Sequence, residues 1–177
     1  METHRIVQTH RLILLLTAFI LFSVSACTYQ GDEFTFSAPF GFKTELLEIP
    51  KVNLNKDPVS LLFSKNGHVS FWVSRQTIPE ESDLESVFTA YKAQPIGASL
   101  HYQFISQTMI KVNDRQAIEY VYRQYSGEGY WQRREVWMEN NGRAYTLVCS
   151  DPVVSTPGVV IPVSEVCIRL VEGFQFK

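Results

Sequence analysis

Residues 103–149, QFISQTMIKV-NDR-QAIEYVYRQY-SGEG-YWQRREVWME-NNG-RAYTLVC, form the stretch that decides the fold. Its segments 103–112, 116–125, 130–139 and 143–149 alternate apolar and polar residues with a period of two, which is typical of half-buried strands. The three connections between them are short and rich in turn-forming residues, as the links between antiparallel neighbours are. The stretch therefore predicts a four-stranded antiparallel meander.

More strands are expected upstream of the meander. Residues 34–37 alternate aromatic and polar side chains, and residues 43–49 follow after a turn. Residues 59–64 and 68–76 flank Asn66-Gly67, which is a strong signal for a two-residue hairpin turn. The upstream part of the chain is therefore also predicted to be mostly strand.

Two helices are expected, one on each side of the meander in the sequence. Ser82 and Glu85 have the Ser-x-x-Glu spacing of a capping box, and apolar residues at helical spacing follow, so a helix is predicted over residues 83–94. Residues 163–174 place their apolar side chains along one stripe. This pattern predicts a short C-terminal helix.

The first 26 residues have the features of a secretory signal peptide. Arg5 and Arg11 precede an apolar run over residues 12–24, which is too short to span a bilayer but suits a signal. The end of this segment, Val24-Ser25-Ala26-Cys27, resembles a bacterial lipobox, whose cysteine is lipidated and becomes the new N-terminus. The alternative is an ordinary signal peptide cut near Ala26, which would leave Cys27 as a free thiol.

The lipobox resemblance divides the chain into three parts. Residues 1–26 are predicted to be a lipoprotein signal peptide, with lipidation at Cys27. Residues 27–33 are expected to be a short polar tether, and residues 34–177 are expected to be one globular domain.

Two cysteines, Cys149 and Cys167, then remain in a chain that is expected to be exported, where disulfides persist. Tyr145, Leu147 and Cys149 share one face of the last meander strand, and Cys167 lies on the apolar stripe of the C-terminal helix. If the helix covers that face, both sulfurs point into one interface and a Cys149–Cys167 disulfide follows. Two buried free thiols are the alternative.

Composition restricts the function classes that remain. Without residues 1–26 the chain keeps 14 of its 16 Lys and Arg and 17 of its 18 Asp and Glu, so its net charge is −3. This charge does not favour nucleic-acid binding, which requires a basic surface. Its two remaining histidines, His68 and His101, lack the spacing of a zinc site, and no metal or cofactor is predicted. Gly97-x-Ser99-x-His101 lacks the second glycine of the hydrolase elbow, so it does not predict catalysis.

Four short motifs resemble the PsbP-like domain: Phe34-x-Phe36-x-x-Pro39-x-Gly41-Phe42, Ser82-x-Leu84-Glu85, Gly142-x-x-Tyr145-Thr146-Leu147 and Gly173-Phe174-x-Phe176. That superfamily includes the PsbP extrinsic protein of photosystem II, its lipid-anchored cyanobacterial relatives and the DcrB-type bacterial lipoproteins. The resemblance covers nearly all of residues 34–177. It implies an α+β fold, a central antiparallel β-sheet flanked by helices on both faces in an α-β-α sandwich. It also implies a non-enzymatic binding role, because these family members act through protein partners.

The best candidates for partner binding lie on the hairpin of residues 116–125 and 130–139. Trp131, Arg133, Trp137 and Arg123 are of residue types enriched at binding hot spots. Alternation puts Trp131, Arg133 and Trp137 on one face of their strand, and if they are exposed together they are the predicted partner surface. The alternative is that a helix covers the aromatic face and the arginines reach past it to water.

The sequence as a whole predicts an exported, lipid-anchored binding or accessory module on a bacterial membrane. Its domain would face the periplasm or the cell exterior and act through a protein partner, and it would not be an enzyme. A small-molecule- or metal-binding lipoprotein is the second hypothesis, and a hydrolase is the third. A ligand binder requires a concave apolar pocket, whereas an enzyme requires perturbed titratable groups in a cleft.

Overall fold

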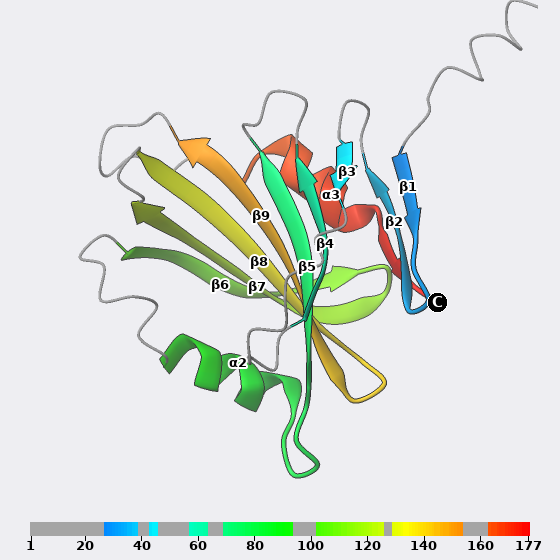
Figure 1. The fold of residues 1–177 in the computed structure, drawn as a ribbon. Helices are drawn as coiled ribbons and strands as arrows, with labels where there is room; N and C mark the ends of the chain where they lie inside the picture. Colours follow the sequence, from blue (N-terminus) through cyan, green and yellow to red (C-terminus); the bar gives the residue numbers. More distant parts are fainter. Residues whose placement is uncertain are drawn as a thin grey trace, which may run out of the picture.

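The structure is a computed structural model that describes residues 27–38, 43–45, 57–63, 69–93, 102–125, 129–153 and 163–177 (Figure 1). The predicted signal peptide, His68, His101 and the Gly97-x-Ser99-x-His101 segment lie outside the described residues, as does the Asn66-Gly67 turn. Neither helix in the described part of the chain has the length and apolarity to cross a membrane.

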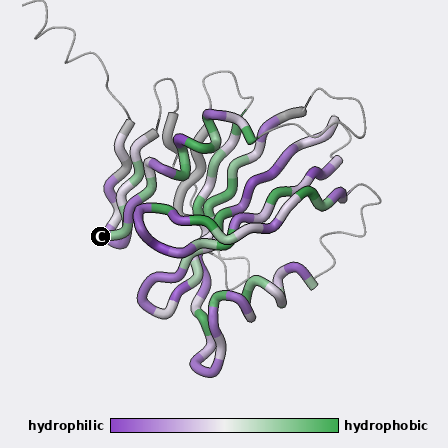
Figure 2. The backbone as a smooth tube through the Cα atoms, turned by 180° about the vertical axis from the view of Figure 1, so that it is seen from behind, coloured by the Kyte–Doolittle hydropathy of each residue, from purple (hydrophilic) through white to green (hydrophobic). Residues whose placement is uncertain are grey.

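Seven strands form one antiparallel sheet, in the order β3-β4-β5-β9-β8-β7-β6. Strands β6 to β9 are consecutive neighbours, so the predicted meander is confirmed. Both hydrophilic and hydrophobic stretches occur in its strands (Figure 2), and β8 has an uninterrupted polar run from Gln132 to Glu135. Strand β9 is longer than the predicted 143–149, because its pairing with β8 continues to residue 153. The strands are β3 Lys43–Glu45, β4 Asp57–Phe63, β5 Ser70–Thr77, β6 Tyr102–Val112, β7 Arg115–Tyr125, β8 Tyr130–Asn140 and β9 Arg143–Val153.

Two of the meander turns are two-residue turns at the same end of the sheet. Asn113 and Asp114 have φ angles of 48° and 65°, and Asn141 and Gly142 have φ angles of 52° and 69°. Positive φ at both turn residues is the type I′ geometry, whose twist matches that of the flanking strands. Asn, Asp and Gly tolerate this conformation best, which is why these residues set the register of the hairpins.

A second, three-stranded sheet has the order β1-β2-β10, with β1 Cys27–Gln30, β2 Phe34–Ala38 and β10 Phe174–Phe176. The first of these strands occupies residues that the sequence predicted as a tether, and it pairs with β2 from Cys27 opposite Ala38. Helix α3, Glu165–Glu172, is shorter than predicted because the chain turns into β10 at Gly173. A Cβ atom at Gly173 would lie 2.1 Å from the Ser37 carbonyl oxygen, so only glycine fits there.

An aromatic core joins the small sheet to the large one. Phe34 and Phe36 of β2 are buried, and the Phe34 ring lies 4.9 Å from that of Phe174. Tyr145 of β9 contacts Phe176 edge to face at 4.8 Å between ring centroids. Three of the four motifs that resemble the PsbP-like domain therefore meet in this core.

Helix α3 packs against the end of β9, and the predicted disulfide between Cys149 and Cys167 is confirmed there. The two Cα atoms are 5.7 Å apart, within the normal range for a disulfide. Both cysteines are buried, so the bond ties the helix to the sheet from inside the core.

Helix α2, Leu84–Ala93, packs on the opposite face of the large sheet. Its cap is Asp83 instead of the predicted Ser82, because the Ser86 amide donates to Asp83 Oδ1 at 2.8 Å. Phe88 is fully buried and its ring contacts those of Tyr120 and Trp137 at 5.4 Å and 5.5 Å.

The predicted α-β-α sandwich is wrong. The described residues are mostly β, with only two short helices of 10 and 8 residues, and these do not form layers on both faces. On the α3 side the small sheet supplies much of the covering, through Phe34, Phe36 and Phe174. The physical reason is that Gly173 divides the C-terminal apolar stripe into a helix and a strand, and that strand pairs with β2.

Strand β8 carries two adjacent buried charges that point to opposite faces, Arg134 and Glu135. On the α3 side, Arg134 Nε donates to Glu119 Oε1 at 2.6 Å. Arg134 Nη1 donates to the Cys167 carbonyl oxygen of α3 at 3.2 Å. This arginine therefore fixes α3 as well as its neighbouring strand.

On the α2 side, the Glu135 carboxylate accepts three hydrogen bonds. The Tyr91 hydroxyl of α2 donates to Oε1 at 2.7 Å, and the Tyr122 hydroxyl donates to the same oxygen at 2.8 Å. The Trp137 indole donates to Oε2 at 3.0 Å. Burial, followed by the Glu135 charge, raises the pKa values of Tyr91 and Tyr122, so both hydroxyls keep their protons.

We expect Cys149→Ser to lower the free energy of unfolding of the oxidised domain by about 3 kcal/mol, because the bond closes a loop between residues 18 apart. Under reducing conditions the same variant should differ little from the parent. Thermal melts with and without reductant measure both effects, and an equal drop in the two conditions would contradict a stabilising disulfide.

We expect Glu135→Ala to lower the free energy of unfolding by at least about 3 kcal/mol, because three buried donors lose their acceptor. Tyr91→Phe removes one donor only and should cost about 1 kcal/mol. The matched control is Glu139→Ala, an exposed glutamate on the same strand, which should cost less than about 0.5 kcal/mol. Urea unfolding would contradict the role of Glu135 if both glutamate variants lost the same stability.

Candidate functional site

The face of the sheet that carries α2 is ordered in four rows across β6, β7 and β8. A bulge between Phe104 and Ser106 changes the parity of β6, so Phe104 and Met109 share this face although they are five residues apart. From the end near Tyr125 to the opposite end, the rows are Tyr102–Gln124–Trp131, Phe104–Tyr122–Arg133, Gln107–Tyr120–Glu135 and Met109–Ile118–Trp137.

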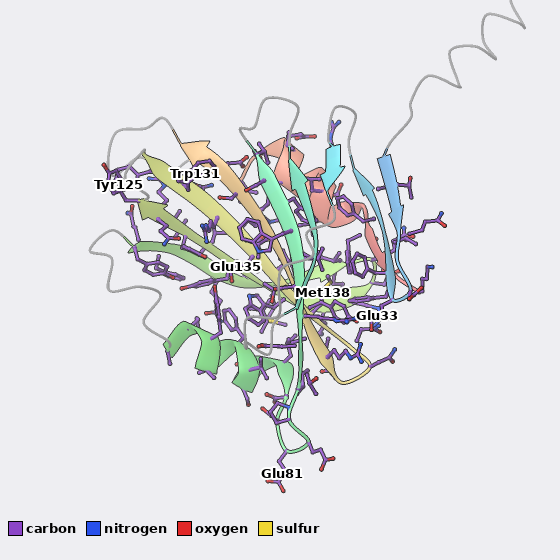
Figure 3. The ribbon with its side chains drawn as sticks, viewed as in Figure 1. Glu33, Glu81, Tyr125, Trp131, Glu135 and Met138 are labelled. Atoms are coloured by element: carbon purple, nitrogen blue, oxygen red, sulfur yellow. A yellow bond between two sulfur atoms is a disulfide. The ribbon has the colours of Figure 1, made fainter. Side chains whose placement is uncertain are left out.

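Helix α2 lies over the third and fourth rows. Phe88 packs on Trp137, and the Tyr91 hydroxyl donates to Glu135. Glu135 is labelled between the sheet and α2 in Figure 3. Lys92 of the last helical turn donates to Gln107 Oε1 at 2.7 Å. The first two rows lie beyond these contacts, and they contain Trp131 and Arg133.

The four residues predicted for partner binding are not exposed together. Trp131, Arg133 and Trp137 do share a face, as alternation predicts, but Trp137 is 0% exposed beneath α2. Arg123 is on the opposite face and is 3% exposed. For Trp137 the structure therefore has the predicted alternative, a helix over the aromatic face, while Trp131 and Arg133 remain half-buried.

The first two rows form the surface that we call the distal patch: Tyr102, Phe104, Gln124, Trp131 and Arg133. Phe104 is 55% exposed, although it is a large apolar side chain. Three polar atoms in the patch are buried without a hydrogen-bond partner: Tyr102 Oη, Gln124 Oε1 and Arg133 Nε. Buried polar atoms are normally paired, so these three require an explanation. A group bound at the patch could pair with them once their side chains turn outward.

The chemistry of the distal patch suits a partner that presents both polar groups and rings or aliphatic chains. Arg133 Nε can donate a hydrogen bond and Gln124 Oε1 can accept one. The Tyr102 hydroxyl can do both. The Arg133 guanidinium also lies over the Trp72 ring of β5, 5.5 Å from its centroid, which holds the arginine in place.

Sequence reasoning did not find Tyr102, Phe104, Gln124 or Trp72 as members of this site. Strand alternation alone cannot place Phe104, because the bulge reverses the parity of β6 in the middle of the strand. Trp72 is on β5, which is far from β8 in the sequence. In the sheet only β9 lies between these two strands, and this neighbourhood cannot be read from the order of the chain. The tyrosines and tryptophans of the hairpin were the signal that did find the region.

A second candidate is a polar pocket of about 330 Å³ at the opposite end of the molecule, and Glu33 is its best-bonded group. Its carboxylate accepts hydrogen bonds from Arg75, Arg143 and, at 2.9 Å, the Tyr145 hydroxyl. Burial acts to raise the pKa of Glu33, but the hydrogen bonds and the two arginine charges together hold it below its usual 4.5. These bonds fasten the turn before β2 to β5 and β9, so they explain Glu33 as a structural clamp. The pocket is lined by Asp32, Glu33, Asn140, Asn141, Arg143, Tyr145 and Lys177.

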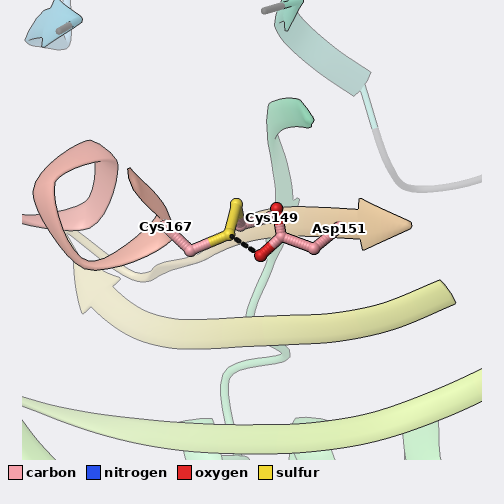
Figure 4. A group of neighbouring side chains, drawn as sticks. All are labelled: Cys149, Asp151 and Cys167. Carbon is pink, nitrogen blue, oxygen red and sulfur yellow. Dashed lines mark hydrogen bonds between the residues drawn. A yellow bond between two sulfur atoms is a disulfide. The ribbon is translucent and has the colours of Figure 1, made fainter. Parts of the chain in front are cut away.

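Cys149, Asp151 and Cys167 form the cluster of potential metal ligands in the described part of the chain (Figure 4). Both sulfurs are committed to the disulfide, so they are not available to a metal ion. Cys167 Sγ lies 3.2 Å from Asp151 Oδ2, a distance at which a hydrogen bond can form only when the sulfur carries a proton after reduction. Burial raises the pKa of Asp151, against a hydrogen bond from Ser164 that lowers it.

No family model and no curated protein matches the sequence, whereas solved structures do match the fold. The solution structure of cyanobacterial PsbP from Synechocystis sp. PCC 6803 has a TM-score of 0.65 at 12% identity, over 88% of this chain and 95% of that one. LpqN, involved in cell envelope biogenesis of Mycobacterium tuberculosis, has a TM-score of 0.51 at 9% identity, over 88% and 87% of the two chains.

A Bacteroides thetaiotaomicron protein has a TM-score of 0.52 at 8% identity, and the match covers 81% of this chain but 45% of that one. At such identities these likenesses concern the fold alone. The resemblance to the PsbP-like domain is confirmed at that level, since the match to cyanobacterial PsbP covers 88% of this chain.

We expect Glu33→Gln to remove a pH-dependent part of the stability. A carboxyl whose pKa is lowered by folding stabilises the fold above its unfolded pKa, near 4.5, and that contribution disappears as pH falls through the lower folded pKa. The stability difference between parent and variant should therefore be largest at neutral pH and shrink below about pH 4.5. Asp32→Asn, in the same turn but exposed, is the matched control, and melts across pH 3–7 that gave parallel curves for parent and Glu33→Gln would contradict the clamp.

Proposed function

We propose that this protein is a non-enzymatic binding or accessory module of the bacterial cell envelope, held at a membrane by a lipid on Cys27. It acts through a protein partner that binds the distal patch. The observation that carries the proposal is the set of three unpaired buried polar atoms, Tyr102 Oη, Gln124 Oε1 and Arg133 Nε, beside the exposed Phe104 ring.

Two further observations support a partner surface. Arginine, tryptophan and tyrosine are the residue types that dominate binding energy at interfaces, and Arg133, Trp131 and Tyr102 lie in one patch. The strands beneath the patch are held from both faces by buried charges, so the side chains sit on a rigid platform. The fold is also that of cyanobacterial PsbP and of LpqN, an envelope biogenesis protein, which supports an envelope role by analogy only.

A small-molecule-binding lipoprotein is the second hypothesis, and the polar pocket around Glu33 is the observation that favours it. Its volume is in the range of small-ligand sites, but its lining is charged and polar where such sites are mostly apolar. Glu33 is also already bonded by two arginines and a tyrosine. A protein partner at the distal patch is therefore the stronger hypothesis.

Photocrosslinking in the native host tests the proposal. A photoreactive phenylalanine analogue at position 131 or 133 should give one dominant protein adduct, because these side chains lie in the distal patch. The same analogue at Thr89, on the exposed side of α2, is the control and should not give that adduct. No adduct from 131 or 133, or the same adduct from 89, would contradict partner binding at the patch.

The anchor is checked in the same strain with Cys27→Ser. In cells fed an alkyne fatty acid, the parent protein should be labelled and the variant should not, while the fold and the disulfide of the variant remain. Equal labelling of parent and variant would contradict an anchor at Cys27. Because the adduct and the fatty-acid label are separate readouts, each part of the proposal can fail alone.

A further inference from the structure

We propose that the end of the domain that carries Cys27 rests on the membrane surface, with the Tyr125 and Tyr130 side chains in the lipid headgroup layer. This inference rests on the proposed lipid anchor. It adds the orientation of the domain and names a lipid surface as a second contact.

The proposed lipid is joined to the fold by a very short connection. Cys27 is the first residue of β1 and is paired with Ala38 of β2, so no free tether separates a lipid on Cys27 from the sheet. A lipid that inserts in the bilayer then holds this end of the domain against it. A short connection gives a high effective concentration of the nearby surface at the membrane, so even a weak contact is populated.

The direction of β2 shows which part of the large sheet lies at the same end. The Phe34 ring is 6.5 Å from that of Tyr145, and the Phe36 ring stacks at 4.9 Å on Phe71, which is paired with Cys149. Strand β2 therefore runs in the same direction as β9.

Strand β9 ends where its residues 152 and 153 pair with Trp131 and Tyr130. Cys27 and the start of β8 are consequently at one end of the molecule, which is the upper end in Figure 1. Trp131 and Tyr125 are labelled at that end in Figure 3.

The Tyr125–Tyr130 pair has the chemistry of a membrane interface. The two residues form the last described pair of the β7–β8 hairpin, with ring centroids 5.3 Å apart, and Tyr125 is 37% exposed. Tyrosine has an apolar ring and a polar hydroxyl, which is why it is enriched at the level of lipid headgroups.

The opposite end has a different character. It carries the two type I′ turns and the polar pocket with Asp32, Glu33 and Lys177, and it ends in charged and amide side chains. Such groups favour water over the bilayer. Trp131, in the first row of the distal patch, is near the Cys27 end, so a partner at the patch would itself be in the membrane or next to it.

Vesicle tethering tests this orientation with the chain that begins at Cys27. Because Cys149 and Cys167 are bonded, Cys27 is the one thiol that a maleimide lipid can couple in vesicles of brominated phosphatidylcholine. Tyr125→Trp adds a reporter at the proposed contact, and Thr77→Trp adds one on an exposed residue at the opposite end. The three native tryptophans are the same in both variants.

The added emission of Tyr125→Trp should shift to shorter wavelength and be quenched by the brominated chains, while that of Thr77→Trp should show neither effect. Equal quenching of the two reporters, or none in either, would overturn the proposal. A flexible Gly/Ser linker of about 20 residues inserted after Cys27 should reduce the quenching, because the domain is then free to leave the surface. Unchanged quenching would overturn the role of the short connection.

The failure of this inference is distinguishable from the failure of the proposed function. Chemical coupling replaces cellular lipidation, so the vesicle result depends only on the orientation. The fatty-acid labelling of parent and Cys27→Ser depends only on the anchor, and the crosslinks from 131 and 133 depend only on the patch.

Discussion

Arg134 and Glu135 are adjacent charges on β8 whose side chains leave the strand on opposite faces, and the position of both helices depends on them. Arg134 bonds the Cys167 carbonyl of α3, and Glu135 bonds the Tyr91 hydroxyl of α2. A buried charge without partners would cost several kcal/mol, so the native arrangement is the one that supplies them. One strand thus determines what covers each side of the sheet.

The rest of the architecture follows from how the two faces are completed. On the α3 side the disulfide and the aromatic core of β2, β9 and β10 close the interface, and Gly173 lets the chain pass close to Ser37. On the other face α2 covers only the rows that end in Glu135 and Trp137. The partial cover leaves the distal patch, so the shortness of α2 connects the fold to the proposed function.

The two ends of the large sheet differ in chemistry because different types of residue lie at them. Type I′ turns require Asn, Asp or Gly, and these collect with the Glu33 clamp at one end. The other end begins with Cys27 and holds the Tyr125–Tyr130 pair. Among the described residues, one end of the sheet is polar and the other carries an aromatic pair, and this difference orients the domain if a lipid is attached at Cys27.

The sequence by itself determined the meander and the α2 segment, because period-two alternation, helical spacing and turn residues act over a few neighbours. It left the Cys149–Cys167 bond as one of two alternatives, because the bond depends on which face of β9 the C-terminal helix covers. Only the tertiary structure decided that Trp137 lies under α2 while Trp131 and Arg133 lie beyond it and remain half-buried, since that depends on which rows α2 crosses. It alone revealed the strands β1 and β10, which are too short to show a period and form by pairing with β2. It alone put Phe104 on the same face and in the same row as Arg133, because a bulge in β6 reverses the side-chain parity that local alternation predicts.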